Sequence, residues 1–208
     1  MNHQTEERLY LYPVWIRIWH MTNAILCLIL IITGLSIQFS NPETVVKFNA
    51  AVSVHNIAGI ILSVSYGLFF LGNLFTPNGA YYVIPVKGFL IRLQKQFIYY
   101  TVGLFKKENA PFPVTEEQKF NPLQQVTYVV LMYGFVPFLI LSGWGLLYPE
   151  ITVKSFVGLS GLDLTDLFHI TAGFAVSIIM CVHVYFCTIG KNPTSNFKSM
   201  INGYHESH

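Results

Sequence analysis

Four histidines lie inside or at the ends of long apolar stretches: His20, His55, His169 and His183. Ionisable side chains are costly in a bilayer, so each of them needs a function or a partner. His169 and His183 are 14 residues apart. In a helix that is nearly four turns, so both side chains point the same way, about 21 Å apart along one axis. With one histidine on each of two further helices, the set could bind two stacked haems.

Two imidazoles on one haem iron leave no open position for oxygen, so such a centre exchanges electrons and does little bond chemistry. Two centres about 20 Å apart would conduct electrons across most of a bilayer. A lone histidine in a membrane can instead be a hydrogen-bonded packing residue or one step of a proton path.

The composition is that of a membrane protein. The chain has 208 residues, of which 53% are hydrophobic and 11% charged, against about 25% charged residues in a soluble domain. A net charge of +2 without a basic, aromatic-rich cluster argues against a nucleic-acid partner. The cysteines form no C-x-x-C or C-x-x-C-H motif, which excludes a zinc ribbon, an encoded iron–sulfur cluster and a covalent c-type haem.

Four apolar stretches are long enough to cross about 30 Å of hydrocarbon. They cover residues 18–39, 52–75, 124–147 and 164–189. No small-residue cleavage pattern follows the first stretch, so we expect it to be retained as a membrane helix. The sequence therefore predicts an all-α membrane protein, a bundle of four transmembrane helices in one domain that covers residues 1–208.

A long connection, residues 76–123, joins the second and third stretches. Within it, residues 85–107 mix apolar and basic side chains, which predicts an amphipathic helix lying in the membrane interface, beside Tyr99 and Tyr100 at headgroup depth. A solvated loop with a few apolar residues is the alternative.

The basic residues predict the orientation of the chain. In the arrangement with four spans, only Lys47 and Lys154 lie on one side. The positive-inside rule then places both termini and the long connection in the cytoplasm. We expect the membrane to be the cytoplasmic (inner) membrane of a bacterium or archaeon. The ten basic residues on the cytoplasmic side are Arg8, Arg17, Lys87, Arg92, Lys95, Lys106, Lys107, Lys119, Lys191 and Lys198.

This orientation pairs the histidines by depth. His55 and His169 fall near the outer ends of their helices, and His20 and His183 near the cytoplasmic ends. Because the orientation was derived without the histidines, the pairing independently supports an outer and an inner haem. A histidine proton relay in a haem-free transporter would not require matched depths, and no carboxylate deep within the four stretches would partner it.

Three neighbours of the histidines could also serve a haem. Gly59 and Gly173 each follow a histidine by one helical turn, where a missing side chain leaves room for a porphyrin face; close helix packing is the alternative. Arg17 precedes His20 by one turn and could pair with a haem propionate, or anchor the helix in the headgroup layer.

Several segments resemble cytochrome b membrane subunits. The resemblance is greatest to the thiosulfate reductase cytochrome b type, which groups with the gamma subunit of formate dehydrogenase and the cytochrome b of membrane nickel–iron hydrogenases. It covers nearly the whole chain. The segments that carry it are Arg17-Ile-Trp-His20, residues 119–128 (KFNPLQQVTY), Leu141-Ser-Gly-Trp144, and the pair His169 and His183.

This resemblance implies a four-helix bundle with two non-covalent b haems, the inner one ligated by His20 and His183 and the outer one by His55 and His169. It also implies a quinone site near the inner haem. Polar side chains of residues 121–125 could donate hydrogen bonds to a quinone there, namely Asn121, Gln124 and Gln125, although Asn-Pro is also an ordinary helix start. Leu123 stands where the formate dehydrogenase relatives have a glycine.

The expected function is that of a membrane electron-transfer subunit between a quinone pool and a partner redox enzyme. The partner would be an iron–sulfur or multihaem cytochrome c subunit with a catalytic subunit, on the outer face. The alternative is a stand-alone cytochrome b oxidoreductase that reacts directly with a small diffusible redox species and quinone. Co-purification with other subunits would distinguish the two.

Overall fold

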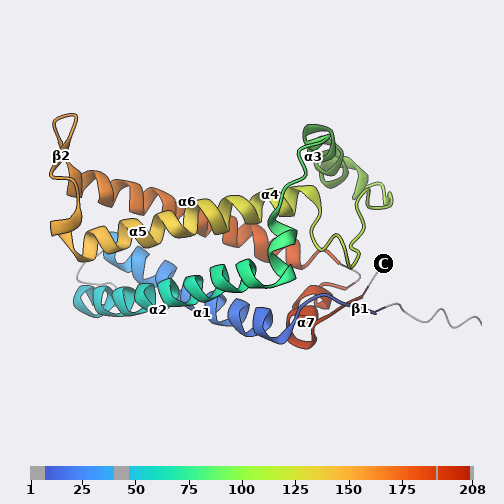
Figure 1. The fold of residues 1–208 in the computed structure, drawn as a ribbon, viewed down its shortest axis with the longest axis horizontal. Helices are drawn as coiled ribbons and strands as arrows, with labels where there is room; N and C mark the ends of the chain where they lie inside the picture. Colours follow the sequence, from blue (N-terminus) through green and yellow to red (C-terminus); the bar gives the residue numbers. More distant parts are fainter. Residues whose placement is uncertain (1–7, 40–46, 191, 207–208) are drawn as a thin grey trace, which may run out of the picture. The chain divides into compact units, whose positions relative to one another are not determined.

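The computed structural model describes residues 8–39, 47–190 and 192–206. Four helical segments in this part of the chain are long and apolar enough to cross a membrane: Val14–Gln38 (α1), Phe48–Phe75 (α2), Pro122–Leu147, and Gly161–Cys187 (α6) (Figure 1). The predicted all-α membrane architecture is confirmed. Each helix begins before its predicted boundary, because a hydropathy window marks the apolar stretch and misses the first helical turn.

The third spanning segment is not a continuous α-helix. It consists of α4 (Pro122–Val130), a π-helical turn (Leu131–Phe135) and α5 (Val136–Leu147). Pro137 has no N–H to donate to the carbonyl of Tyr133 four residues earlier, so the regular α-helical ladder cannot continue there. A π-turn that accommodates such a break is frequently found at functional sites.

The chain divides into two compact units. The first, called the bundle unit below, comprises Ile18–Phe70 and Gly134–Tyr185. It holds most of α1, α2 and α6, all of α5, and a hairpin of strands β2 (Ser155–Phe156) and β3 (Leu159–Ser160).

Tryptophans join the helices of the bundle unit. Trp19 on α1 stacks on Phe69 of α2 with ring centroids 4.2 Å apart, and its Nε1 donates to the Ser65 carbonyl at 3.1 Å. Trp144 on α5 donates to the Ser63 hydroxyl on α2 at 3.2 Å. Each indole therefore satisfies its one polar group while its ring covers apolar surface.

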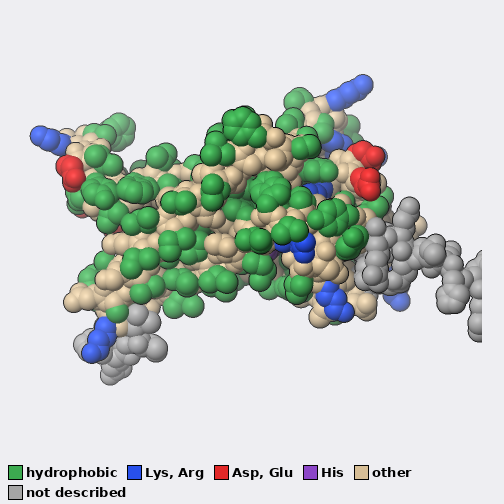
Figure 2. Space-filling view, turned by 60° about the horizontal axis from the view of Figure 1, so that its bottom comes forward, with side chains coloured by type: hydrophobic (Ala, Val, Ile, Leu, Met, Phe, Trp, Pro, Cys, Tyr) green, Lys and Arg blue, Asp and Glu red, His purple; other side chains and the backbone are tan. Residues whose placement is uncertain are grey.

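Apolar side chains point outward along the helices of the bundle unit. Leu68 and Phe174 are 65% and 64% exposed, whereas Phe69 is the one large side chain with no exposed surface among the described residues. Hydrophobic side chains, green in Figure 2, are spread along the helices on the face shown there. In water this pattern would be unfavourable, but lipid tails cover such a surface in a membrane.

The second unit, called the loop unit below, comprises the described parts of Met1–Arg17, Leu71–Tyr133 and Phe186–His208. It contains a 3₁₀ helix (Pro77–Tyr82), α3 (Phe89–Ile98) followed by a π-turn (Tyr99–Gly103), α4, and α7 (Ser195–Asn202). Strands β1 (Arg8–Tyr10) and β4 (Tyr204–Glu206) pair in antiparallel fashion.

The amphipathic segment of the long connection is helical, although α3 is shorter than residues 85–107. Its polarity is inverted relative to a soluble helix, since Leu90 is 76% exposed while Gln96 is 2% exposed. That inversion is what contact with lipid would favour, and the interfacial position of α3 stays a prediction. Of the ten basic residues counted in the orientation argument, Lys191 lies outside the described residues.

Candidate cofactor site

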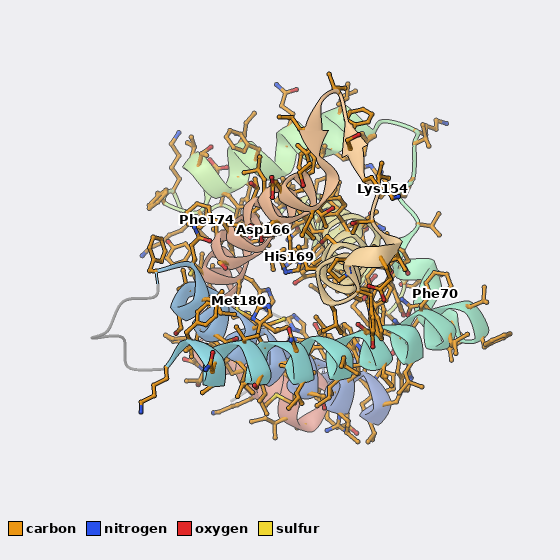
Figure 3. The ribbon with its side chains drawn as sticks, turned by 90° about the vertical axis from the view of Figure 1, so that its left-hand side faces the viewer. Phe70, Lys154, Asp166, His169, Phe174 and Met180 are labelled. Carbon is orange, nitrogen blue, oxygen red and sulfur yellow. The ribbon has the colours of Figure 1, made fainter. Side chains whose placement is uncertain are left out.

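The bundle unit brings the four histidines together in two pairs. The ring centroids of His55 (α2) and His169 (α6) are 6.3 Å apart, and those of His20 (α1) and His183 (α6) are 6.2 Å apart. These are the pairs named from the sequence. Figure 3 shows His169 directed into the space between the helices, whereas Phe174 on the same helix points outward.

Both separations suit a metal held between two imidazoles. A metal bound to one nitrogen of each ring at about 2 Å places the two ring centroids roughly 6 Å apart. Each pair supplies only two ligands, and no cluster of three or more His, Cys, Asp or Glu occurs in residues 8–39, 47–190 and 192–206. An iron at either position would therefore take its remaining ligands from a macrocycle, which fits haem.

The Thr33 hydroxyl orients His55. Thr33 Oγ1 donates to the Ile29 carbonyl at 2.7 Å and lies 2.9 Å from His55 Nδ1. A hydroxyl has one proton, and here it is directed to the backbone, so Oγ1 accepts from the Nδ1–H of the ring. This contact fixes the tautomer and leaves the lone pair on Nε2, which is the atom available to a metal.

His169 has the same arrangement on its own side. Ser142 Oγ donates to the Phe138 carbonyl at 2.7 Å and lies 2.8 Å from His169 Nδ1. The hydroxyl is again the acceptor, and Nε2 of His169 again carries the lone pair. Metal-ligating histidines almost always donate their other ring N–H to a fixed acceptor, so both rings are prepared for ligation.

Glycines make room around this pair of histidines. A Cβ added to Gly34 would lie 3.4 Å from His55 Cε1, and one added to Gly143 would lie 3.3 Å from His169 Cε1. By contrast, a Cβ added to Gly59 or Gly173 would meet no described atom within 4 Å. Close helix packing therefore does not explain these last two glycines, and the open space is the kind that a macrocycle could fill.

Among the described contacts, His20 lacks the hydroxyl support seen at His55 and His169. His20 Nδ1 is buried and has no hydrogen-bond partner among the residues that the structure describes. A buried ring nitrogen without a partner is unfavourable unless a water or a bound group satisfies it. The two pairs thus share a separation and differ in their surroundings.

Arg17 belongs to the loop unit. Its Nη1 donates to the carbonyl of Ile201 on α7, and its Nε is buried without a partner among the described residues. The side chain is thus partly engaged with the backbone of its own unit. Its predicted contact with a haem propionate stays a prediction.

The predicted quinone residues lie together at the start of α4, where they hold the local structure. Asn121 and Gln124 form a reciprocal capping box, with Oδ1 of Asn121 accepting from the Gln124 N–H at 3.0 Å. Asn121 Nδ2 donates to the Tyr100 hydroxyl at 2.7 Å. Gln125 Nε2 donates to the carbonyls of Tyr81 and Val83. The side-chain amide donors of Asn121 and Gln125 are therefore engaged within the loop unit, whereas Gln124 is engaged through Oε1, which accepts from the Asn121 N–H at 3.1 Å.

The sequence reasoning missed the surroundings of Lys119. This side chain is 5% exposed; its Nζ lies 3.3 Å from Asn78 Oδ1 and 4.3 Å from the Tyr81 ring centroid. No carboxylate forms an ion pair with it among the described contacts, and burial lowers the pKa of Lys119 to about 8. A Lys beside an aromatic-rich segment is the signal that could have indicated a buried cation.

Four apolar spanning helices, three of which bring imidazoles together in pairs at metal-binding separation, are the arrangement expected of a b-type cytochrome of the membrane. The chain belongs to the family described as prokaryotic cytochrome b561, which matches residues 11–203. It is also 40% identical over 200 residues to the Escherichia coli (strain K12) protein named "Putative cytochrome YdhU", covering 96% of this chain and 75% of that protein.

The family membership confirms the resemblance to cytochrome b membrane subunits. It makes the chain a multi-pass membrane protein with b-type haem and electron transfer as its activity. The residues present fit such a group, because two imidazoles have their Nε2 lone pairs available and two glycines leave open space beside them.

Proposed function

We propose that this chain is the membrane electron-transfer subunit of a redox complex and carries electrons through two b haems between a quinone pool and a partner enzyme. His55 and His169 would ligate the outer haem, and His20 and His183 the inner haem. The observation that carries this proposal is the occurrence of two imidazole pairs at nearly the same separation, 6.3 and 6.2 Å.

A haem with two axial imidazoles supplies one-electron oxidation and reduction without a free coordination position. The chain's own residues would keep both imidazoles in place, so that no coordination position is free. Thr33 and Ser142 hold two of the imidazoles in one tautomer, and both hydroxyl side chains are buried in the bundle unit. Such a site favours electron exchange over reaction with dioxygen.

The distribution of Lys and Arg supports an orientation with both termini and the long connection in the cytoplasm. The membrane would be the cytoplasmic (inner) membrane of a bacterium or archaeon. The His55–His169 pair would then face the outer side. A partner there, an iron–sulfur or multihaem cytochrome c subunit with its catalytic subunit, would exchange electrons with the outer haem.

The quinone would react on the inner side, near the start of α4. Asn121, Gln124 and Gln125 are the polar residues we assign to this site, and Arg17 is the partner we assign to an inner haem propionate. Since both donors of the Gln125 amide are engaged within the loop unit, a quinone carbonyl bound to Gln125 would have to replace one of these contacts.

Haem extraction and a redox difference spectrum on the detergent-purified chain test the proposal. We expect about two low-spin b haems per chain. One haem would contradict the two-haem arrangement, with His20 the first ligand to question, and folded protein without haem would contradict ligation altogether. A stand-alone oxidoreductase would instead purify without other subunits and react directly with a small oxidant or reductant.

The variant His169→Ala tests the pairing. We expect it to retain the inner haem and lose the outer one, because its partner His55 alone cannot hold a six-coordinate iron. Retention of both haems would remove His169 from the ligand set, and loss of only the inner haem would reverse the assignment. A surface histidine is not needed as a control, since His20→Ala should give the complementary loss.

A further inference from the structure

The two histidines of the outer pair receive the same support from two different helices. On α1, Thr33 contacts His55 Nδ1 at 2.9 Å and the next residue, Gly34, lies against Cε1. On α5, Ser142 contacts His169 Nδ1 at 2.8 Å and the next residue, Gly143, lies against Cε1. A hydroxyl followed by glycine thus positions each ring.

We propose that Thr33 and Ser142 are positioning residues that fix the outer imidazoles and lower the reduction potential of the iron held between them. This inference rests on the proposed function, in which His55 and His169 ligate the outer haem. It goes beyond that function because it assigns a role to residues that ligate nothing and gives the two haems unequal potentials.

The direction of the effect follows from the hydrogen bonds. Both hydroxyls direct their proton to a backbone carbonyl, that of Ile29 or Phe138, so each can only accept from Nδ1–H. Accepting that hydrogen bond makes the imidazole more basic at Nε2. A more basic pair of ligands stabilises the ferric state over the ferrous state, which lowers the reduction potential.

Hydroxyls elsewhere in the bundle unit show that back-bonding alone does not create this contact. Ser177 and Thr171 on α6 also donate to the carbonyl four residues earlier, at 2.8 and 2.7 Å, and neither forms a described contact with a histidine. Thr33 and Ser142 are also more buried, at 5% and 8% exposure. Their low exposure strengthens the hydrogen bond, because water does not compete for the ring N–H.

The inner pair provides the contrast. His20 Nδ1 has no hydrogen-bond partner in the described part of the chain, so at least one inner imidazole lacks the support that both outer rings have. The hydrogen bonds accepted from the outer imidazoles would therefore give the outer haem the lower reduction potential of the two. Electrons would then pass favourably from the outer haem to the inner haem, that is, from the partner enzyme toward quinone.

A redox titration of purified, haem-loaded variants tests the inference. Thr33→Val keeps the shape and removes the hydroxyl, Ser142→Ala removes the other, and Ser177→Ala is the matched control with the same backbone contact. We expect each hydroxyl variant to raise the midpoint of one of two haem transitions. A tenfold change in the ratio of reduced to oxidised haem at fixed potential corresponds to about 59 mV.

Electron paramagnetic resonance of the ferric state gives an independent readout. The low-spin signal of the same haem should change in Thr33→Val and Ser142→Ala and stay unchanged in Ser177→Ala. Should Thr33→Val lose haem, Thr33→Ser decides, because it restores the hydroxyl. Return of both haems with the original midpoints would support the inference, whereas failure of the serine variant to restore them would overturn it.

Unchanged midpoints and spectra in hydroxyl variants that keep both haems would overturn the inference. So would an equal shift in Ser177→Ala. These results differ from a failure of the proposed function, which would appear as two retained haems in His169→Ala. The ligand assignment can therefore survive while the role of the two hydroxyls is rejected.

Discussion

Replacing Gly173 by leucine should remove one haem without unfolding the bundle. Gly173 follows His169 by four residues on α6, which turns it about 40° from the direction of the histidine and moves it about 6 Å along the axis. A Cβ there meets no described atom within 4 Å. A flat macrocycle centred between His169 and His55 would extend over this turn, and a leucine would occupy its place.

The magnitude follows from what the substitution does and does not remove. Gly173 makes no side-chain contact that could be lost, and leucine is favoured over glycine in a helix by about 0.5–1 kcal/mol. The haem-free bundle should therefore be as stable as before, or slightly more so. The haem content should fall from about two per chain to about one, because the outer position alone is blocked.

Haem extraction scaled to protein, followed by a redox difference spectrum, measures this loss. Gly59→Leu on α2 should give the same result from the other side, since Gly59 follows His55 by four residues and also meets no atom within 4 Å. Thr171→Leu is the control, because this exposed residue lies about 200° around α6 from His169. Two haems retained in folded Gly173→Leu and Gly59→Leu would refute the reasoning.

Three further predictions concern single side chains. Gly143→Val should displace the His169 ring and lower the haem content. Gly143→Ala, whose Cβ would lie 3.3 Å from His169 Cε1, should retain two haems. Equal haem content in the two variants would contradict this prediction. Asn121→Leu should weaken the binding of a quinone-site inhibitor at unchanged haem content, and loss of the helix cap should cost about 1 kcal/mol of stability. Asn121→Asp keeps the capping acceptor but loses the amide donor, so it should weaken inhibitor binding to the same extent. Unchanged inhibitor affinity in both variants would remove Asn121 from the quinone site. The pKa of Lys119 is about 8 in the folded chain, against 10.5 in the unfolded chain. Between these two pH values the unfolded chain binds more protons than the folded chain, so stability should rise with pH across this window. This rise can be measured as an increase in apparent melting temperature with pH, and Lys119→Met should flatten it. An equal rise in the variant would contradict the prediction.

The spanning helices could be predicted from the sequence because lipid imposes a composition on every turn that crosses it. The boundaries were less accurate, as at Val14 and Phe48, since helical turns outside the hydrocarbon need no apolar residues. The π-turn before Pro137 was not predicted. Proline indicates a break in the ladder, but the neighbouring contacts decide whether the helix kinks, ends or widens by one residue.

The histidine pairs named from depth are brought together in the structure, and their role as ligands stays a prediction. Depth was sufficient to pair them because a helix fixes the height of each residue, and charge fixes the direction of the helix. The polar groups at the start of α4 were harder to interpret. Asn121 was recognised both as a capping residue and as a quinone donor, and only the structure shows that its amide contacts Tyr100.

The residues that contact His55 and His169 were visible in the sequence but carried no meaning by themselves. Ile32-Thr33-Gly34 and Leu141-Ser142-Gly143 repeat one pattern near the end of a spanning helix. A hydroxyl in an apolar helix normally bonds to its own backbone, which makes it uninformative about partners. The pattern becomes informative only when a histidine from another helix arrives at the same height. Hydroxyl–glycine pairs at the depth of intramembrane histidines should therefore mark such positioning residues in the sequences of related chains.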